Sequence, residues 1–279
     1  MTSILLNGKR KPANELILTA DSRALRYGDG FFETMMIRDG RIHLEPYHLN
    51  RIQQSLSALR FDLPKLADPR IWITQAAELA LRNGHDAFGR IRLTVFRGAG
   101  GLFDPENLHP NYLIESWALP EHFSDWNENG LVLGIASQLA KSADMLANLK
   151  HNNYLVYAMA ALEAKEKHWN DALLLNTDGK LADSTIANLF IVEGSRFVTP
   201  PLSDGPVAGV RRSDLLSFMQ RVGCRVEESS ISPERLLQAD EVFLTNALRP
   251  LRWVQRIGDQ AFGNAKTYDL YLRYRATIS

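Results

Sequence analysis

The sequence is poor in the residues that build several common kinds of site. Cys224 is its single cysteine, so an intrachain disulfide is excluded and a reducing, cytoplasmic compartment is expected. It contains no HExxH, no CxxC pair and no calcium-type loop, and its seven histidines are scattered, so no metal site is predicted. The glycine-rich run from Gly98 to Gly101 lacks the spacing of a dinucleotide site, and no Walker lysine is present.

Charge and hydropathy exclude further classes of protein. The 32 basic residues balance 32 acidic ones, so no overall positive field favours binding to nucleic acid or to a membrane surface. No apolar run is long enough to span a bilayer, and the N-terminal segment lacks the pattern of a signal peptide. The 279 residues, 45% of them hydrophobic, predict a soluble globular protein with room for two domains.

Strand and helix signals alternate along the chain. Hairpin turns are expected at Asn7-Gly8 and Asp39-Gly40. Apolar spacing predicts amphipathic helices over residues 46–59, 69–82, 152–167 and 210–222. The polar segment 120–129 is typical of a linker. This mixed pattern predicts an α/β or α+β protein with an N-terminal domain over 1–119 and a C-terminal domain over 130–279.

Four features could together carry chemistry. Lys150 precedes a long predicted helix in a locally uncharged stretch, where desolvation would lower its pKa and make it a usable amine nucleophile. Most lysines are solvated, so Lys150 alone does not predict a catalytic site, and the prediction depends on the other three features. Asp183 could pair with a protonated heteroaromatic nitrogen, the helix that begins at Val210 offers an anion site, and Arg51 adds positive charge. A phosphorylated pyridine aldehyde needs these groups.

Six motifs occur in a defined order along the chain. They are RALRYGDGFFET from Arg23, HLNRIQQS around Arg51, KHNNYL from Lys150, GKLADSTIANLF around Asp183, GVRR from Gly209 and FLTNAL from Phe243. In this order they resemble the class IV, or fold type IV, pyridoxal-phosphate enzymes. That family includes branched-chain aminotransferases, D-amino acid aminotransferases and 4-amino-4-deoxychorismate lyases.

The resemblance implies a two-domain fold of the D-amino acid aminotransferase type, a homodimer and an amino-acid-like substrate. It implies that Lys150 forms the Schiff base with pyridoxal 5'-phosphate and moves the proton at the substrate α-carbon. Asp183 would face the pyridine nitrogen, while Tyr154 would pack near the ring or serve only structural packing. The residues it assigns to the cofactor phosphate are Arg51, the backbone N–H groups of Val210 and Arg211, and the turn Asn246-Ala247.

Three departures from the family pattern matter. Asp183 stands where the family usually has glutamate, so the backbone must come closer or a water must intervene. Arg211 stands where aminotransferases usually carry threonine, which preserves a backbone contact to phosphate but not a hydroxyl contact. Met36 takes the place of an arginine typical of branched-chain enzymes, and the loop after Arg97 lacks the Arg and His of the D-amino acid enzymes.

Several functions remain open. The KHxN, RGxGG and NALxP patterns and the chain length favour an aminodeoxychorismate lyase, which releases pyruvate and 4-aminobenzoate by β-elimination, although Leu102 and Trp253 depart from its usual residues. The alternatives are an amino-acid aminotransferase of the branched-chain or D-amino acid type, a catalytically silent scaffold, and a cofactor-free Schiff-base lyase.

Overall fold

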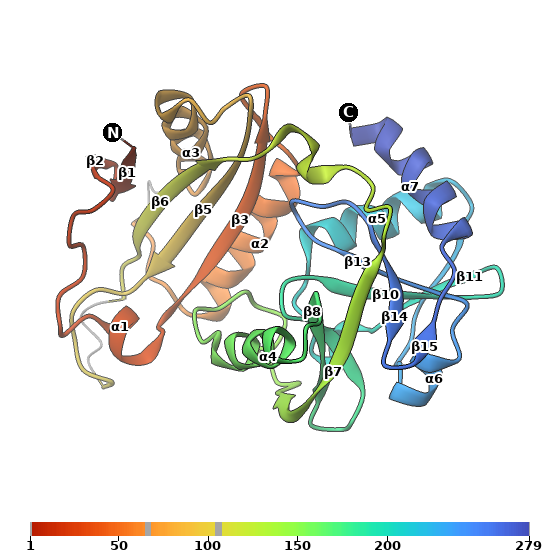
Figure 1. Ribbon diagram of the computed structural model, residues 1–279. Coiled ribbons are helices and arrows are strands. Elements are labelled where there is room, and N and C mark those ends of the chain that lie inside the picture. Colours follow the sequence, from red (N-terminus) through yellow and green to blue (C-terminus); the bar gives the residue numbers. More distant parts are fainter. Residues whose placement is uncertain (1, 65–67, 104–107, 279) are drawn as a thin grey trace. The chain divides into compact units, whose positions relative to one another are not determined.

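The computed structural model describes residues 2–64, 68–103 and 108–278, which group into two compact units (Figure 1). Unit 1 holds the chain up to Phe123 together with Leu149–Asn153, and unit 2 holds Ser124–Asn148 and the chain from Tyr154 onward. The break after Phe123 falls within the predicted linker. Segment 149–153 lies with unit 1 because its backbone pairs with a strand there, so Lys150 does not group with the C-terminal domain to which the sequence division assigned it.

Unit 1 is an antiparallel sheet with helices on one face. Its sheet order is β2-β1-β6-β5-β3-β4. Its elements are β1 (Ser3–Leu6), β2 (Lys9–Pro12), α1 (Arg23–Tyr27), β3 (Gly30–Arg38), β4 (Arg41–Ile42), α2 (Glu45–Ala58), α3 (Arg70–Asn83), β5 (Phe88–Phe96) and β6 (Asn111–Ala118), followed by the 3-10 turn η1 (Glu121–Ser124).

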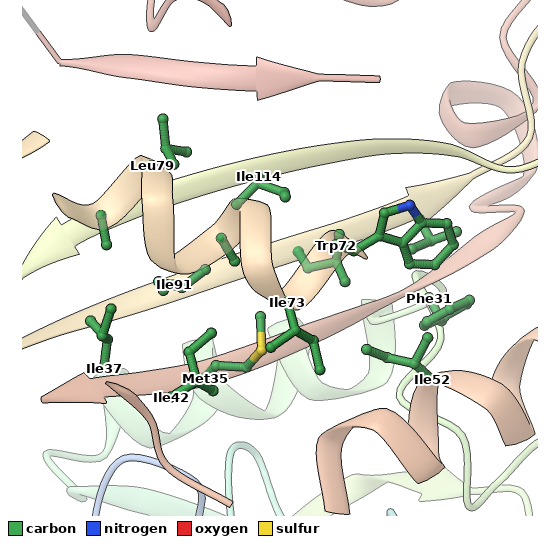
Figure 2. Close-up of a cluster of buried hydrophobic side chains, with 14 of the residues drawn as sticks. Phe31, Met35, Ile37, Ile42, Ile52, Trp72, Ile73, Leu79, Ile91 and Ile114 are labelled. Atoms are coloured by element: carbon green, nitrogen blue, oxygen red, sulfur yellow. The ribbon is translucent and has the colours of Figure 1, made fainter. Parts of the chain in front are cut away.

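The core of unit 1 lies between the sheet and helices α2 and α3 (Figure 2). Successive side chains of a strand point to opposite faces, so Phe31, Met35 and Ile37 of β3 share the helix-covered face. They pack with Ile52 of α2 and Trp72 of α3, all buried. Burying one such side chain contributes about 1.5–3 kcal/mol. The opposite face of the sheet carries Phe32 and Met36, both buried, among charged residues.

Unit 2 is built on a mixed sheet in the order β12-β11-β10-β13-β14-β7-β8-β9, with β15 on β14. Because β9 pairs with β10 as well as β8, the strands from β10 through β13, β14, β7, β8 and β9 form a closed circuit around a leucine- and valine-rich core. Its elements are β7 (Leu131–Lys141), α4 (Leu155–Glu166), β8 (Asp171–Asn176), β9 (Leu181–Ser184), β10 (Asn188–Glu193), β11 (Arg196–Thr199), η2 (Leu202–Asp204), α5 (Val210–Arg221), β12 (Arg225–Glu228), α6 (Pro233–Leu237), β13 (Glu241–Thr245), β14 (Arg252–Ile257), β15 (Gln260–Ala261) and α7 (Ala265–Ile278).

Three of the four predicted helices lie within one residue of α2, α3 and α5. The fourth, predicted from residue 152, begins only at Leu155, because the residues before it extend along β3. The C-terminal helix α7 was not anticipated. Across the described ranges, no helix has both the length and the apolar character that crossing a bilayer requires.

Candidate functional site

Lys150 lies on an extended segment beside β3 in unit 1. Its carbonyl accepts a hydrogen bond from the Phe32 N–H at 2.9 Å, and the Asn152 N–H donates to the Gly30 carbonyl at 2.9 Å. The Lys150 Nζ sits 4.4 Å from the centroid of the Phe32 ring. An ammonium over a ring face is stabilised by about 0.5–2 kcal/mol, so the strand positions both the backbone and the amine of Lys150.

Gly30 makes this close approach possible. A Cβ at residue 30 would lie 2.1 Å from the Val95 carbonyl oxygen and 2.7 Å from Asn152 Nδ2. A side chain would therefore clash first with the backbone of β5 and then with the side chain of Asn152, so β3 could not keep both neighbours at their present distance. The YGDG run therefore ends at the residue beside which the segment of Lys150 packs.

The face of the sheet that carries Lys150 is rich in arginine. Arg92 places its Cζ 3.8 Å from the centroid of the same Phe32 ring. Two further guanidinium groups on this face stack on aromatic rings: Arg90 on Trp117 at 4.9 Å and Arg38 on Phe88 at 4.6 Å. All three arginines are half-buried. Sequence reasoning missed them, although the alternation in RIRLTV places arginines opposite a buried face.

Arg51, the predicted phosphate arginine, lies in a buried cluster with Glu33 and His48 in unit 1. Its Nε and Nη2 bind the two Glu33 carboxylate oxygens at 2.7 and 2.6 Å, and His48 Nδ1 lies 2.6 Å from Glu33 Oε2. Burial alone would raise the pKa of Glu33, but Arg51 and His48 outweigh it and lower that pKa to about 2. The Glu33 carboxylate therefore orients the Arg51 guanidinium, and the phosphate role of Arg51 stays a prediction.

Asp183 lies in β9 of unit 2, where β9 pairs with β10. Its side chain is 2% exposed and accepts hydrogen bonds from Lys141 Nζ at 3.1 Å, the Tyr157 hydroxyl at 3.1 Å and the Val207 N–H at 2.8 Å. Neither Lys141 nor Tyr157 was anticipated from the sequence. A buried carboxylate held by three donors is rigid, as an acceptor for a ring nitrogen must be.

The first turn of α5, also in unit 2, has the form of an anion site. Gly209 caps the helix, and a Cβ there would lie 1.9 Å from Asn188 Oδ1, so a larger residue would displace the Asn188 side chain or the helix start. Within the described ranges, no protein acceptor binds the backbone N–H groups of Val210 and Arg211. Such N–H groups and the helix dipole favour a phosphate.

The Arg211 side chain connects this helix start to the second predicted phosphate element. Its guanidinium is 1% exposed and donates to the Ala247 carbonyl at 3.1 Å and to the Tyr274 hydroxyl of α7 at 3.1 Å. Asn246 closes the turn by accepting from the N–H groups of Leu248 and Arg249 at 3.0 and 2.9 Å. The structure therefore brings the 210–211 and 246–247 segments together, and arginine in place of threonine at 211 has a structural use.

Tyr154 packs within unit 2. Its ring stacks on Tyr157 with centroids 4.2 Å apart, and its hydroxyl donates to the Thr185 carbonyl at 3.2 Å. Packing against a cofactor ring stays a prediction.

The residues present suit a pyridoxal phosphate. Within unit 1 these are Lys150 and Arg51. Within unit 2 they are the buried carboxylate of Asp183 and a helix start whose N–H groups have no acceptor among the described residues. Within the described part of the chain, no cluster of three or more His, Cys, Asp or Glu side chains could hold a metal ion.

The chain is similar to known proteins over most of its length. The family model of amino-transferase class IV matches residues 30–257. The chain is 31% identical over 228 residues to the aminodeoxychorismate lyase of Vibrio harveyi, covering 81% of this chain and 82% of that protein. The structure of 4-amino-4-deoxychorismate lyase from Pseudomonas aeruginosa is similar with a TM-score of 0.82 and 27% identity, covering 98% of each chain.

A branched-chain aminotransferase structure from Thermoproteus uzoniensis is also similar, with a TM-score of 0.88 and 24% identity over 99% of this chain and 94% of that one. Together these matches confirm the predicted two-domain fold type.

Proposed function

Because the chain belongs to the class IV aminotransferase family, whose enzymes depend on pyridoxal 5'-phosphate, we propose that it catalyses the aminodeoxychorismate lyase reaction. The relative from Vibrio harveyi supports this choice, as do the KHxN, RGxGG and NALxP patterns. The observation that carries the proposal is the arginine-rich sheet face on which Lys150 lies.

That face suits a substrate with more than one carboxylate. Pyruvate and 4-aminobenzoate are both carboxylic acids, so their common precursor carries two such groups. Arg92 and Lys150 both contact the Phe32 ring. Arg90 lies two residues from Arg92 on β5 and points to the same face of the sheet. Half-buried guanidinium groups bind carboxylates more strongly than solvated ones do. An aliphatic amino acid offers only one carboxylate, and its apolar side chain would lie against charged groups.

Each residue then has a defined task. The cofactor supplies an electron sink for the carbon that bears the substrate amine. Lys150 holds the cofactor and removes the proton from that carbon, after which the bond at the neighbouring carbon breaks and the leaving group takes up a proton to become pyruvate. Asp183 accepts a hydrogen bond from the ring nitrogen. Arg92 orients a substrate carboxylate. The groups that bind the cofactor phosphate are Arg51, the N–H groups of Val210 and Arg211, and the Asn246-Ala247 turn.

The test is direct. The purified holoenzyme is incubated with aminodeoxychorismate, and pyruvate and 4-aminobenzoate are measured in parallel with an amino-acid panel containing 2-oxoglutarate. The proposal expects the two products in equal amounts. Absence of pyruvate, with ready transamination of branched-chain or D-amino acids, would overturn it in favour of an aminotransferase. Bound cofactor with no turnover of either kind would indicate a silent scaffold.

Arg92 provides a sharper test of the substrate class. We expect Arg92→Met to raise KM for aminodeoxychorismate about tenfold or more, because a charge-assisted hydrogen bond is worth about 1.5–3 kcal/mol. Arg82→Met, at an exposed position on α3, which covers the other face of the sheet, is the matched control and should leave KM unchanged. An unchanged KM in Arg92→Met would remove the substrate role of this arginine.

The homodimer and the cytoplasmic location implied by the family resemblance also remain proposals. Light scattering of the purified protein tests the first, and a mass of one chain would contradict it.

A further inference from the structure

Lys141, the last residue of β7, is a buried lysine with no role in the chemistry described so far. It is 5% exposed, and its Nζ lies 3.1 Å from Asp183 Oδ2. Burying an ammonium costs several kcal/mol unless a counter-charge is well placed. Burial lowers the pKa of Lys141, and the Asp183 carboxylate opposes that shift. The position of this charge therefore requires an explanation.

The local backbone aims Lys141 at its partner. The pairing of β7 with β8 shifts register between Ile135 and Ala140, and Lys141 follows directly, opposite Asn176. Such irregularities re-aim the side chains that come after them. The Thr177 N–H donates to the Lys141 carbonyl at 3.2 Å, which holds the strand end in place.

The two oxygens of Asp183 are used unequally. Oδ2 accepts from Lys141, Tyr157 and the Val207 N–H at 3.1, 3.1 and 2.8 Å. Oδ1 has only the Tyr157 hydroxyl at 3.4 Å among the residues that the structure describes. Burial and the nearby Asp183 charge raise the pKa of Tyr157, so its hydroxyl stays a neutral donor. Oδ1 is thus the oxygen with capacity for one more strong donor.

We propose that Lys141 is a positioning residue that anchors Asp183 through Oδ2. Its positive charge also makes the Asp183 carboxylate a weaker proton acceptor, and Oδ1 is the oxygen that faces the ring nitrogen of the cofactor. This inference rests on the cofactor role of Asp183 in the proposed function. A carboxylate with a cationic partner has a lower proton affinity than an unpaired one. The same anchoring fixes a side chain that is one methylene shorter than the usual glutamate.

The surroundings of Asp183 contain few other titratable groups. Lys141 on β7 and Tyr157 on α4 face the carboxylate. Behind them, Asp144 acts on Lys141, and Tyr154 stacks on Tyr157. Asp144 is exposed, so Lys141 is the one buried cation that contacts Asp183 among the described residues.

The experiment measures the ring nitrogen itself. Holoenzyme is reconstituted with cofactor carrying 15N in the ring, and the 15N chemical shift is followed from pH 5 to 10. In Lys141→Met, we expect the midpoint of nitrogen deprotonation to rise by about one pH unit or more above that of the wild type, the usual effect of removing one close charge. Lys141→Arg keeps the charge and should resemble the wild type. Lys165→Met, at an exposed position on α4, is the matched control.

The outcomes separate this inference from its premise. Asp183→Asn should leave the nitrogen unprotonated across the range; if it does not, the cofactor role of Asp183 fails. If Asp183→Asn does leave the nitrogen unprotonated, two results would overturn the role of Lys141. One is a deprotonation midpoint in Lys141→Met equal to that of the wild type, and the other is a wild-type ring nitrogen that stays protonated from pH 5 to 10. Should Lys141→Met not fold, Lys141→Gln removes the charge while keeping a donor, and the same shift is required of it.

Discussion

Replacing Glu33 with glutamine removes the negative charge at the centre of the buried cluster in unit 1. The substitution keeps the shape of the side chain while leaving Arg51 and His48, 6% and 0% exposed, opposite a neutral amide. Arg51 then has a buried charge without its counter-ion. We therefore expect a large loss of stability at neutral pH that diminishes in acid.

The magnitude follows from the pKa of Glu33. That pKa is about 2 in the folded chain against an ordinary value of 4.5. A difference of roughly 2.5 units at 1.36 kcal/mol per unit is about 3 kcal/mol of stabilisation. Because the folded pKa is depressed, this stabilisation is present above about pH 4.5 and is lost as the pH falls toward about 2. Direct measurements on broken buried ion pairs, about 3–5 kcal/mol, are of the same size.

Urea unfolding followed by circular dichroism measures the effect at pH 7, 4.5, 3 and 2.5. The wild type should exceed Glu33→Gln by about 3–5 kcal/mol at pH 7 and by much less at pH 2.5. Glu78→Gln, at an exposed position on α3, is the control and should unfold like the wild type at every pH. A wild-type advantage that stays constant from pH 7 to 2.5 would refute the reasoning, because Glu33 would then not be the titrating group.

Three further substitutions test the cofactor elements. Gly209→Ala places a methyl group 1.9 Å from Asn188 Oδ1, which displaces the Asn188 side chain or the helix start, and the Kd for pyridoxal phosphate in a fluorescence titration should rise about tenfold or more. Arg211→Met removes donors from a buried hydroxyl and from the carbonyl of the 246–247 turn, and should lower the free energy of unfolding by about 2–5 kcal/mol in urea. Gly30→Ala brings a methyl group against the Val95 carbonyl oxygen of β5 and the Asn152 side chain, so hydrogen exchange should speed up in β5 and in residues 149–153; unchanged exchange in both would contradict the close packing at Gly30.

Local pattern predicted much of the fold. Apolar spacing located α2, α3 and α5 to within a residue. The start of α4 was misplaced because the residues after Lys150 pair with a strand more than a hundred positions earlier, and no local signal reports such a pairing. The grouping of Lys150 with unit 1 has the same cause.

The site was predictable where a residue carries its own signal. Lys150 and Asp183 stand in ordered motifs, whereas Lys141 finds its partner 42 positions away, with nothing nearby in sequence to indicate it. The buried position of Glu33 could have been predicted, because Glu33 alternates with Phe31 and Met35 and so points to the same buried face of β3. A buried acid requires a cation nearby, which would have indicated a buried ion pair.

The most direct test of the central claim is to identify the lysine that holds the cofactor. Borohydride reduction of the holoenzyme fixes pyridoxal phosphate on that lysine, and peptide mass spectrometry then locates it. The structure and the family motifs predict the label on the peptide that contains Lys150, and its loss in Lys150→Ala. A label on Lys141 or on any other lysine, or one that persists in Lys150→Ala, would contradict the account.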